Sequence, residues 1–161
     1  MHQTILNKAS VYLGNSGKPV EKIHMTKKAF DLNNPCIFCN PREDEVLAEN
    51  EHALLIKDNS PVSEGHCLII PKRHVKNNFE INKEENQAFF ELIKKAKSLI
   101  EAKGLNPDGY NIGSNNGIAA GQSVFHLHIH IIPRYNGDVR NPKGGIRQVL
   151  PKTAQYNLDD R

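Results

Sequence analysis

The sequence predicts a single domain in which a sheet of short strands packs against one long amphipathic helix. Two apolar runs near the middle of the chain are separated by a turn, as in a hairpin. The longest periodic stretch, residues 82–103, repeats apolar side chains every three or four positions, which is typical of a helix. Over residues 125–134, histidines alternate with aliphatic residues, which is typical of a strand. With 161 residues, the chain can bury a core without disulfide support.

The first two strands are expected to form an antiparallel hairpin. The runs Ala53–Lys57 (ALLIK) and His66–Pro71 (HCLIIP) are short and rich in aliphatic residues. The turn signal Asp58-Asn59-Ser60-Pro61 follows the first run. A polar cluster, Lys72-Arg73-His74, follows the second run directly.

The helix is expected to begin after Asn82 and to end before Gly104. Asn82 is a good N-cap, and Glu85 three positions later completes a capping-box pattern. Gly104 is typical of the residue that follows a helix. The apolar stripe predicts a helix that covers the core, and no catalytic role is assigned to it.

A third strand is expected at Tyr110–Ser114, followed by a loop of small residues over 115–123 (NNGIAAGQS). Backbone N–H groups in such a loop can approach an anion closely, so the loop suits a phosphate. It leads directly into His126, His128 and His130. On a strand, residues i, i+2 and i+4 share a face, so the three imidazoles are expected in a row about 7 Å apart.

These histidines allow three interpretations. They could be polar side chains on an exposed strand. They could bind a metal, because His-x-His on a strand can place two imidazoles on one ion. They could also perform nucleophilic catalysis, in which one imidazole attacks phosphorus and its neighbours tune it and donate hydrogen bonds.

The cysteines raise a separate question about metal binding. Two of the three are spaced as Cys36-x-x-Cys39, which favours a metal or redox site over a structural disulfide in a cytosolic chain. His74 and His126 could complete a tetrahedral Cys₂His₂ site, with His52 as the alternative to His74. Cys67 lies within an apolar strand and is expected in the core.

Composition narrows the class of protein. The formal net charge is +3, from 21 basic and 18 acidic side chains, which is too mild for a nucleic-acid coat but suits an anionic substrate. No apolar run is long enough to span a membrane, so a cytoplasmic protein with no membrane partner is expected. Basic residues near the C-terminus could favour a substrate with extra phosphates or could simply be solvated: Arg140, Lys143, Arg147 and Lys152.

The segment His126-Leu127-His128-Ile129-His130-Ile131-Ile132 resembles the signature of the histidine triad (HIT) family, His-φ-His-φ-His-φ-φ, at every position. The resemblance covers about residues 36–135 and includes the turn at Asp58 and the run from Gly65-His66 to His74. It implies an α+β fold with a mostly antiparallel five-stranded sheet and helices packed on one side. The implied organisation is an N-terminal extension of unknown role (1–34), a HIT domain (35–135) and a polar C-terminal tail (136–161).

The resemblance also implies a nucleotide hydrolase that cleaves at the α-phosphate, or alternatively a nucleotidyltransferase, a phosphorylase or a nucleotide-binding scaffold. Among the catalytic histidines, His128 would be the nucleophile that forms a covalent nucleotidyl intermediate and His130 would contact the phosphate, with His126 and His66 beside them. The implied nucleotide- and phosphate-binding residues are Asp58 for the ribose hydroxyls with Asn59 beside it, Gln122 and Ser123 for the phosphate or leaving group, and Asn115 and Gly121 to complete the pocket.

In a zinc-bearing branch of this family, the positions of Cys36, Cys39, His74 and His126 match the metal ligands, which implies a closed, structural zinc site. Members of the family are usually homodimers, so a homodimer is expected. The sequence does not name the base, the leaving group or the physiological substrate.

Overall fold

The computed structural model describes residues 36–150, which lie within one compact unit, Asp31–Arg161. The expected extension 1–34 and the end of the expected tail, including Lys152, lie outside the described residues. Five strands are present: β1 (Val46–Glu49), β2 (Ala53–Lys57), β3 (Cys67–Pro71), β4 (Gly109–Gly113) and β5 (Ile129–Arg134). The α-helix α1 spans Lys83–Ala102, and short 3₁₀ turns lie at Glu43–Glu45, Asn78–Glu80, Ile118–Ala120 and Gly145–Val149.

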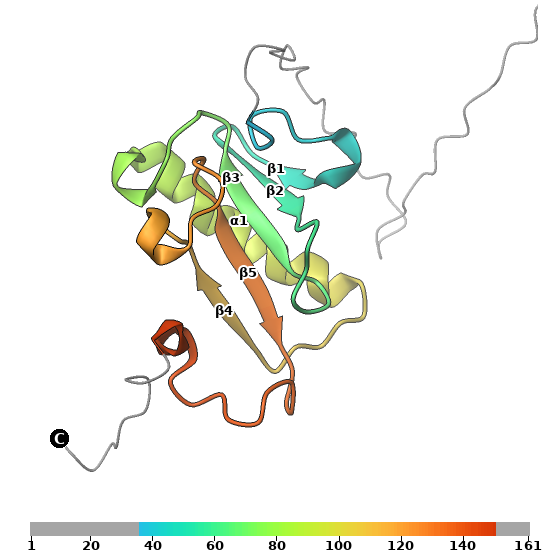
Figure 1. Ribbon diagram of the computed structural model, residues 1–161. Coiled ribbons are helices and arrows are strands. Elements are labelled where there is room, and N and C mark those ends of the chain that lie inside the picture. Colours follow the sequence, from blue (N-terminus) through green and yellow to red (C-terminus); the bar gives the residue numbers. More distant parts are fainter. Residues whose placement is uncertain (1–35, 151–161) are drawn as a thin grey trace, which may run out of the picture. The chain divides into compact units, whose positions relative to one another are not determined.

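The strands form one antiparallel sheet in the order β1-β2-β3-β5-β4. Helix α1 lies across one face of this sheet (Figure 1). The expected α+β architecture, with a five-stranded sheet and its main helix on one side, is therefore confirmed. The last strand in sequence, β5, is inserted between β3 and β4, which brings the histidine segment to the middle of the sheet.

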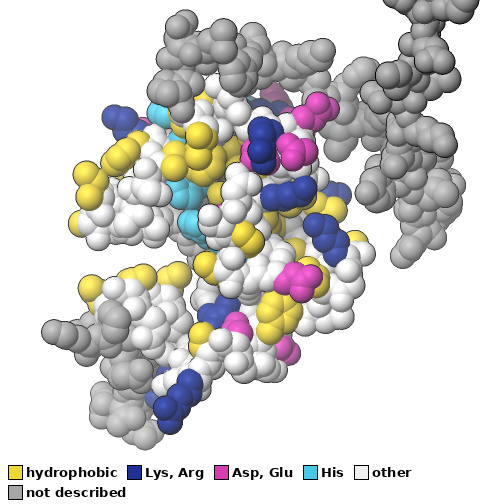
Figure 2. Space-filling model, turned by 45° about the vertical axis from the view of Figure 1, so that its right-hand side comes forward, with side chains coloured by type: hydrophobic (Ala, Val, Ile, Leu, Met, Phe, Trp, Pro, Cys, Tyr) yellow, Lys and Arg dark blue, Asp and Glu magenta, His cyan; other side chains and the backbone are white. Residues whose placement is uncertain are grey.

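The two faces of the sheet have different environments because successive side chains point to opposite sides. Leu55, Ile69 and Ile131 lie on the face that packs against Phe89 of α1. A smaller apolar cluster, Ile56, Leu68 and Ile70 with Phe38 packed against it, occupies the other face. His130 lies directly opposite Leu68 in the ladder and so shares this second face. Histidine side chains reach the surface beside hydrophobic ones (Figure 2).

The ends of α1 agree with those expected from the sequence. The Asn82 side chain accepts from the Glu85 N–H at 2.8 Å, and Glu85 accepts from the Asn82 N–H at 3.0 Å, which is the expected capping box. Gly104, with φ +79°, follows the last turn. Among the described helices, none is both long and apolar enough to cross a membrane.

Strand β5 begins at Ile129, three residues later than the alternation suggests, and the ladder with β3 explains why. The register pairs Ile69 with Ile129, so two positions further the ladder would place Leu127 opposite Pro71. Proline has no N–H to donate, so the ladder stops there. The Leu127 N–H bonds instead to the Val75 carbonyl at 2.7 Å. The segment 126–128 therefore leaves the sheet and turns toward the loop that follows β3.

Two other strands differ by one residue from the bounds expected from the sequence. A further strand, β1, was not expected from its own residues. Strand β3 begins at Cys67 rather than His66, and β4 spans Gly109–Gly113 rather than Tyr110–Ser114. Strand β1 is short and its register with β2 shifts between Val46 and Ala48, so it carries little alternation to detect.

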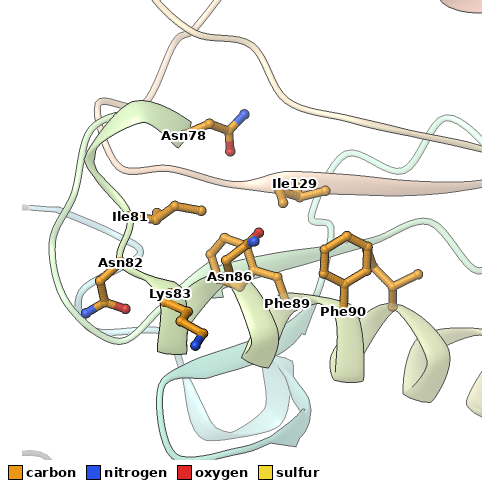
Figure 3. A pocket seen from close by; sticks show the side chains of 9 residues that line it. Asn78, Ile81, Asn82, Lys83, Asn86, Phe89, Phe90 and Ile129 are labelled. Carbon is orange, nitrogen blue, oxygen red and sulfur yellow. The ribbon is translucent and has the colours of Figure 1, made fainter.

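A groove of about 490 Å³ lies where the first half of α1 passes beside β5 (Figure 3). Its apolar part is formed by Ile81, Phe89, Phe90, Ile93 and Ile129, and amide side chains line its rim. Phe90 is 60% exposed there.

Candidate active site and metal centre

A second cleft, also about 490 Å³, opens on the face of the sheet away from α1. Four parts of the chain line it: the arm that precedes β1, the end of β2 with its turn, Leu68 of β3, and the segment that leads into and begins β5. His128, His130 and Ser123 contribute from the last segment, and Asp58 and Asn59 from the turn. The structure thus brings together five of the residues expected at a nucleotide site.

The hydrogen bond of His128 fixes which of its two ring nitrogens carries the proton. Its Nδ1 lies 2.9 Å from the backbone carbonyl of His126. A carbonyl only accepts, so Nδ1 carries the proton and Nε2 of the neutral ring holds a lone pair. His128 is 6% exposed, so this nitrogen is largely screened from bulk water. The ring has the protonation pattern that nucleophilic attack requires.

In His130 the proton is on Nε2 and not on Nδ1, and hydrogen bonds among His66, Asp58 and His130 determine this. The Val62 N–H donates to His66 Nδ1 at 3.2 Å, so the neutral His66 ring carries its proton on Nε2. That Nε2 lies 3.0 Å from His130 Nδ1 and 3.3 Å from Asp58 Oδ2. His130 Nδ1 therefore accepts, which leaves the Nε2–H of His130 as a donor.

Burial keeps these two rings neutral. It lowers the pKa of His66 below its ordinary value, although the nearby Asp58 carboxylate acts in the opposite direction. The pKa of His130 is also lowered, first by burial and then by His128 and His66, again against Asp58. Neutral rings preserve the alternation of donors and acceptors around the cleft.

The trio Asp58, His66 and His130 lies close enough together to suggest a metal site, since its ligand atoms are within 4.8 Å of one another. The Val62 N–H argues against this interpretation. Because it donates to His66 Nδ1, the other nitrogen of that ring carries a proton and has no lone pair for a metal. We therefore regard the trio as a hydrogen-bonded chain.

The metal cluster expected from the sequence assembles elsewhere. Cys36, Cys39, His74 and His126 place their ligand atoms within 4.8 Å of one another. The sulfur–nitrogen distances are 3.4 Å for Cys36–His126, 3.5 Å for Cys39–His126 and 3.2 Å for Cys39–His74. Zinc bond lengths of about 2.3 and 2.0 Å at a tetrahedral angle require about 3.5 Å between sulfur and nitrogen. Two thiols and two imidazoles at this spacing fit zinc. His52, the alternative ligand, is not in the cluster.

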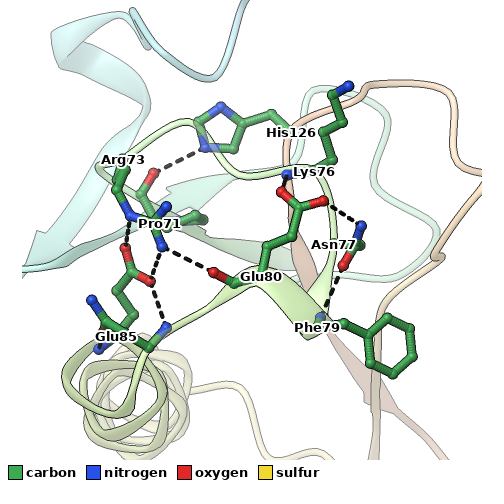
Figure 4. A network of polar contacts seen from close by, with 9 residues as sticks. Pro71, Arg73, Lys76, Asn77, Phe79, Glu80, Glu85 and His126 are labelled. Carbon is green, nitrogen blue, oxygen red and sulfur yellow. Dashed lines mark hydrogen bonds and ion pairs between the residues drawn. The ribbon is translucent and has the colours of Figure 1, made fainter.

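His126 is prepared for this role by its second nitrogen. Its Nε2 donates to the Pro71 carbonyl at 3.0 Å (Figure 4). This leaves the lone pair on Nδ1, the atom that lies near the two sulfurs. The ring is fully buried. The expected row of three imidazoles is therefore wrong in one respect: His126 turns into the metal cluster, whereas His128 and His130 line the cleft with ring centroids 5.1 Å apart. The cause is the departure of residues 126–128 from the sheet.

The small-residue loop contributes differently from what was expected. Gln122 is 5% exposed; its Oε1 accepts from the Gly117 N–H, and its Nε2 donates to the carbonyls of Lys76 and Val124. Both amide hydrogens are used, so the Gln122 side chain supports the loop and is not retained as a phosphate ligand. Gly121 has φ +83°, which favours glycine, and its Cα side faces the Asn115 amide. Neither Gly121 nor Asn115 lines the cleft, whereas Ser123 does.

The sequence interpretation missed part of the cleft. Phe38, between the two cysteines, packs its ring 5.1 Å from that of His128 and 6.0 Å from that of His126. Arg42 and the buried Glu45 line the cleft as well. A Cys-x-x-Cys pair indicates a metal site. It does not indicate that a residue between the two cysteines packs against the ring of residue 128. Cys67 is buried as expected, and burial raises the pKa of its thiol to about 12.

Comparison with known proteins supplies further findings. The family model described as "HIT domain" matches residues 41–137. A relative from Bacillus subtilis, named protein hit, is 42% identical over 104 residues, which are 62% of this chain and 71% of that protein. An adenosine 5′-monophosphoramidase from Schizosaccharomyces pombe is 38% identical over 105 residues, 63% of this chain and 75% of that protein. An adenylylsulfatase from Arabidopsis thaliana is 40% identical over 111 residues, 66% of this chain and 56% of that protein.

Solved structures agree in fold. A HIT family member from Bacillus subtilis superposes with a TM-score of 0.61 at 35% identity, covering 80% of this chain and 86% of that one. A zinc-bound histidine triad family protein from Mycobacterium smegmatis gives a TM-score of 0.58 at 35% identity, covering 65% of this chain and 78% of that one.

Proposed function

Because this chain belongs to the HIT family, we propose that it is a nucleotide hydrolase that cleaves a nucleoside phosphate derivative at the α-phosphate. The observation that carries the proposal is the hydrogen bond from His128 Nδ1 to the His126 carbonyl, which leaves the lone pair of a neutral imidazole on Nε2 within a cleft of nucleotide size.

The reaction proceeds in two displacements. His128 Nε2 attacks the α-phosphorus, a P–N bond forms, and the bond from phosphorus to the leaving group breaks with its electron pair on that group, which takes up a proton. Water then attacks the same phosphorus. The P–N bond breaks, the electron pair returns to Nε2, and a nucleoside monophosphate is released. The His126 carbonyl holds the Nδ1 proton throughout and stabilises the positive charge that develops on the ring.

The other cleft residues stabilise the phosphate and the sugar. The Nε2–H of His130 and the Ser123 hydroxyl are donors for the charge that develops on the phosphoryl oxygens. His66 acts as a supporting group that fixes the tautomer of His130. The Asp58 carboxylate is the acceptor for two ribose hydroxyls. Asn115 and Gly121 shape the loop that carries Ser123 and need not touch the nucleotide.

Two relatives, named adenosine 5′-monophosphoramidase and adenylylsulfatase, support this substrate class. A phosphoramidate is therefore the first substrate to test, followed by dinucleoside polyphosphates. The nucleotidyltransferase or phosphorylase alternative shares the same adduct and differs only in the acceptor. A scaffold that merely binds nucleotide would not need the lone pair on Nε2 of His128.

We also propose that the metal cluster holds zinc with a structural role. Cys36, Cys39, His74 and His126 would be its four ligands, which leaves no open position for substrate. When bound, the metal would tie the arm before β1 to the segment that carries His128. The zinc-bound relative from Mycobacterium smegmatis supports this assignment.

We also propose that the protein forms the homodimer expected from the sequence. Two features support it: β4 is an edge strand on which Ile112 is 42% exposed, and the α1–β5 groove leaves Phe90 60% exposed. Exposed apolar surface of this kind is typical of an interface. Light scattering after size exclusion measures the mass directly, and a purely monomeric mass contradicts the proposal.

The central test is covalent trapping. Wild-type protein is mixed with adenosine 5′-phosphoramidate, quenched and analysed by mass spectrometry; we expect an added adenylyl group on His128. His128→Ala should form no adduct and lose turnover by at least about a thousandfold. His52→Ala, a histidine outside the cleft, is the control and should behave like the wild type. Turnover by His128→Ala at the wild-type rate would refute the mechanism, and product analysis with added phosphate separates hydrolase from phosphorylase.

A further inference from the structure

A buried carboxylate lies at one end of the cleft and has no part in the proposed reaction. Glu45 is 9% exposed and lines the cleft. Its Oε1 accepts from Asn59 Nδ2 at 2.9 Å and lies 2.9 Å from Arg42 Nη2, and its Oε2 accepts from the Arg42 N–H at 3.0 Å. Burial by itself would raise the pKa of Glu45, but the hydrogen bonds from Asn59 and Arg42 outweigh it and the pKa is lowered. The side chain therefore remains an ionised acceptor.

Glu45 fixes the orientation of the Asn59 amide. An ionised carboxylate can only accept, so the nitrogen of the amide must face Glu45 and its oxygen must face away. Within the described part of the chain, the Asn59 Oδ1 receives no hydrogen bond. An exposed amide oxygen with a determined direction is an acceptor available to a ligand in the cleft.

The order of residues along the cleft indicates which part of a nucleotide meets this oxygen. His130 Nδ1 lies 3.8 Å from Asp58 Oδ2, Asn59 follows Asp58 in the chain, and Glu45 follows Asn59 through its hydrogen bond. If the phosphate is at His128 and the ribose at Asp58, the next group along this line is the base.

The walls at this end are suited to a base. Ile37, Phe38, Ile56 and Leu68 supply apolar surface for the faces of a ring. Asn59 can supply a polar contact to the edge of the base, whereas the oxygens of Glu45 are already engaged with Asn59 and Arg42. A carboxylate that already has three such contacts has little acceptor capacity left for the N–H groups of guanine.

We propose that Glu45 is a positioning residue that holds Asn59 so that its amide oxygen reads the edge of the base, and that this oxygen favours a base with an exocyclic amino group over one with an oxo group at the same position. This inference rests on the proposed function, because it takes the phosphate at His128 as its starting point. The acceptor on Asn59 matches a donor such as the 6-amino group of adenine, and a 6-oxo group would face it with a second acceptor.

The test compares two nucleotides that differ at this one position. Binding of AMP and IMP is measured by calorimetry on the full-length protein, together with kcat and KM for adenosine and inosine 5′-phosphoramidates. We expect the wild type to prefer the amino base by about five- to tenfold in Kd and KM, with similar kcat, in line with one hydrogen bond of about 1 kcal/mol. Asn59→Ala should reduce this preference to about one.

Glu45→Gln gives a sharper outcome. Glutamine can donate, so the Asn59 amide can turn over and present its nitrogen to the base; the preference should then fall or reverse toward the oxo base. A role limited to structure would weaken both nucleotides equally. Glu49→Gln is the matched control, because Glu49 is also largely buried (13% side-chain exposure against 12% for Glu45) and is paired with Lys72 outside the cleft. It should keep the wild-type preference.

Failure of the inference and failure of the proposed function give different results. If the wild type and Asn59→Ala show the same AMP/IMP ratio while the His128 adduct forms, the positioning role is wrong and the hydrolase proposal stands. If AMP is preferred and the ratio collapses in Asn59→Ala but no adduct forms, base reading is correct and the catalytic proposal is wrong. A Glu45→Gln variant that fails to fold leaves Asn59→Ala to decide.

Discussion

The backbone carbonyl of His126 accepts the Nδ1 proton of His128 at 2.9 Å, while Nδ1 of the same His126 lies 3.4 Å from the sulfur of Cys36. One residue therefore contacts both sites, through its main chain the His128 imidazole of the cleft and through its side chain the Cys/His cluster. Phe38 adds a second link, because it lies between the two cysteines and packs against the His128 ring.

Metal and nucleotide binding are expected to be coupled as a result. Removing zinc by dialysis against a chelator should weaken AMP binding at least about fivefold, because the Phe38 wall and the His126 carbonyl lose their anchor. Reciprocity requires AMP to raise the affinity for zinc by the same factor, which is measured at equilibrium by competition with a colorimetric chelator. Both quantities are measured without turnover. Phe38→Leu should reduce the coupling, whereas Phe79→Leu, at a ring 90% exposed, should not. Equal AMP affinity with and without zinc would rule the coupling out.

Loss of a metal ligand should cost stability more than catalysis. Cys36→Ser or Cys39→Ser is expected to release zinc and lower Tm by about 5–10 °C, with residual turnover, since neither sulfur takes part in the proposed chemistry. Cys67→Ala is the control for loss of a thiol: it should keep zinc while leaving a small core cavity. Elemental analysis of protein purified without chelator measures the amount of zinc per protein chain. If no zinc is found, the proposal of a structural metal is wrong.

The pH dependence should follow the lowered pKa values of His66 and His130. Burial keeps both rings neutral at pH 7, so we expect kcat to be flat near neutrality and to fall only as the pH drops below the ordinary histidine value of about 6.5. Stability has the same sign: the unfolded rings take up protons first, so the free energy of unfolding falls as the pH falls from the unfolded pKa toward the lower folded pKa.

Replacement of Asp58 tests the cause of that profile. Its carboxylate raises the pKa of both rings, so Asp58→Asn should move the acid limb of kcat to lower pH, measured at saturating substrate because KM should rise as well. His52→Gln, outside the cleft, should leave the limb in place. An acid limb that moves to higher pH in Asp58→Asn would show that another group controls it.

Replacement of Glu85, which caps the start of α1, should lower the free energy of unfolding. Its carboxylate accepts from the Asn82 N–H and from Arg73 Nε and Nη2, the last two at 2.8 Å (Figure 4). Glu85→Ala should lower the free energy of unfolding by about 1–2 kcal/mol, with the Arg73 pair counted at a modest value because that arginine is half exposed. Urea unfolding measures this change. Glu84→Ala, at an exposed position in the same turn, should cost under about 0.5 kcal/mol; equal costs would contradict the role of the cap.

Much of the fold could be predicted because local signals and tertiary structure agree. The capping box at Asn82 and the glycine at 104 correctly bounded α1, and the aliphatic residues that alternate with the histidines, Leu127 and Ile131, lie in the core. The Cys₂His₂ set was also predicted, although Cys36 and His126 are 90 positions apart.

What could not be predicted depends on pairing between distant segments. Alternation specifies the face of a side chain but not where a ladder ends, and Pro71 ends this one so that His126 turns away from the cleft. The family resemblance suggested Gln122 as a phosphate-binding residue, but its side-chain amide is hydrogen-bonded to backbone groups of Gly117, Lys76 and Val124. Glu45 belongs to no sequence motif, and its position in the cleft depends on its contacts with Arg42 and with Asn59 in the turn after β2.

The insertion of β5 between β3 and β4 has a consequence for protein synthesis. The ribosome releases the two cysteines, the β1–β3 meander, α1 and β4 before β5 exists, so β4 has no neighbour in the sheet and the thiols have only part of their ligand set. Translation must pass residue 130 before His126, His128 and the start of β5 are available together. A nascent chain stalled upstream of that point therefore carries two exposed thiols and an unpaired strand, which makes this interval the one in which the newborn protein depends most on protection from oxidants and aggregation.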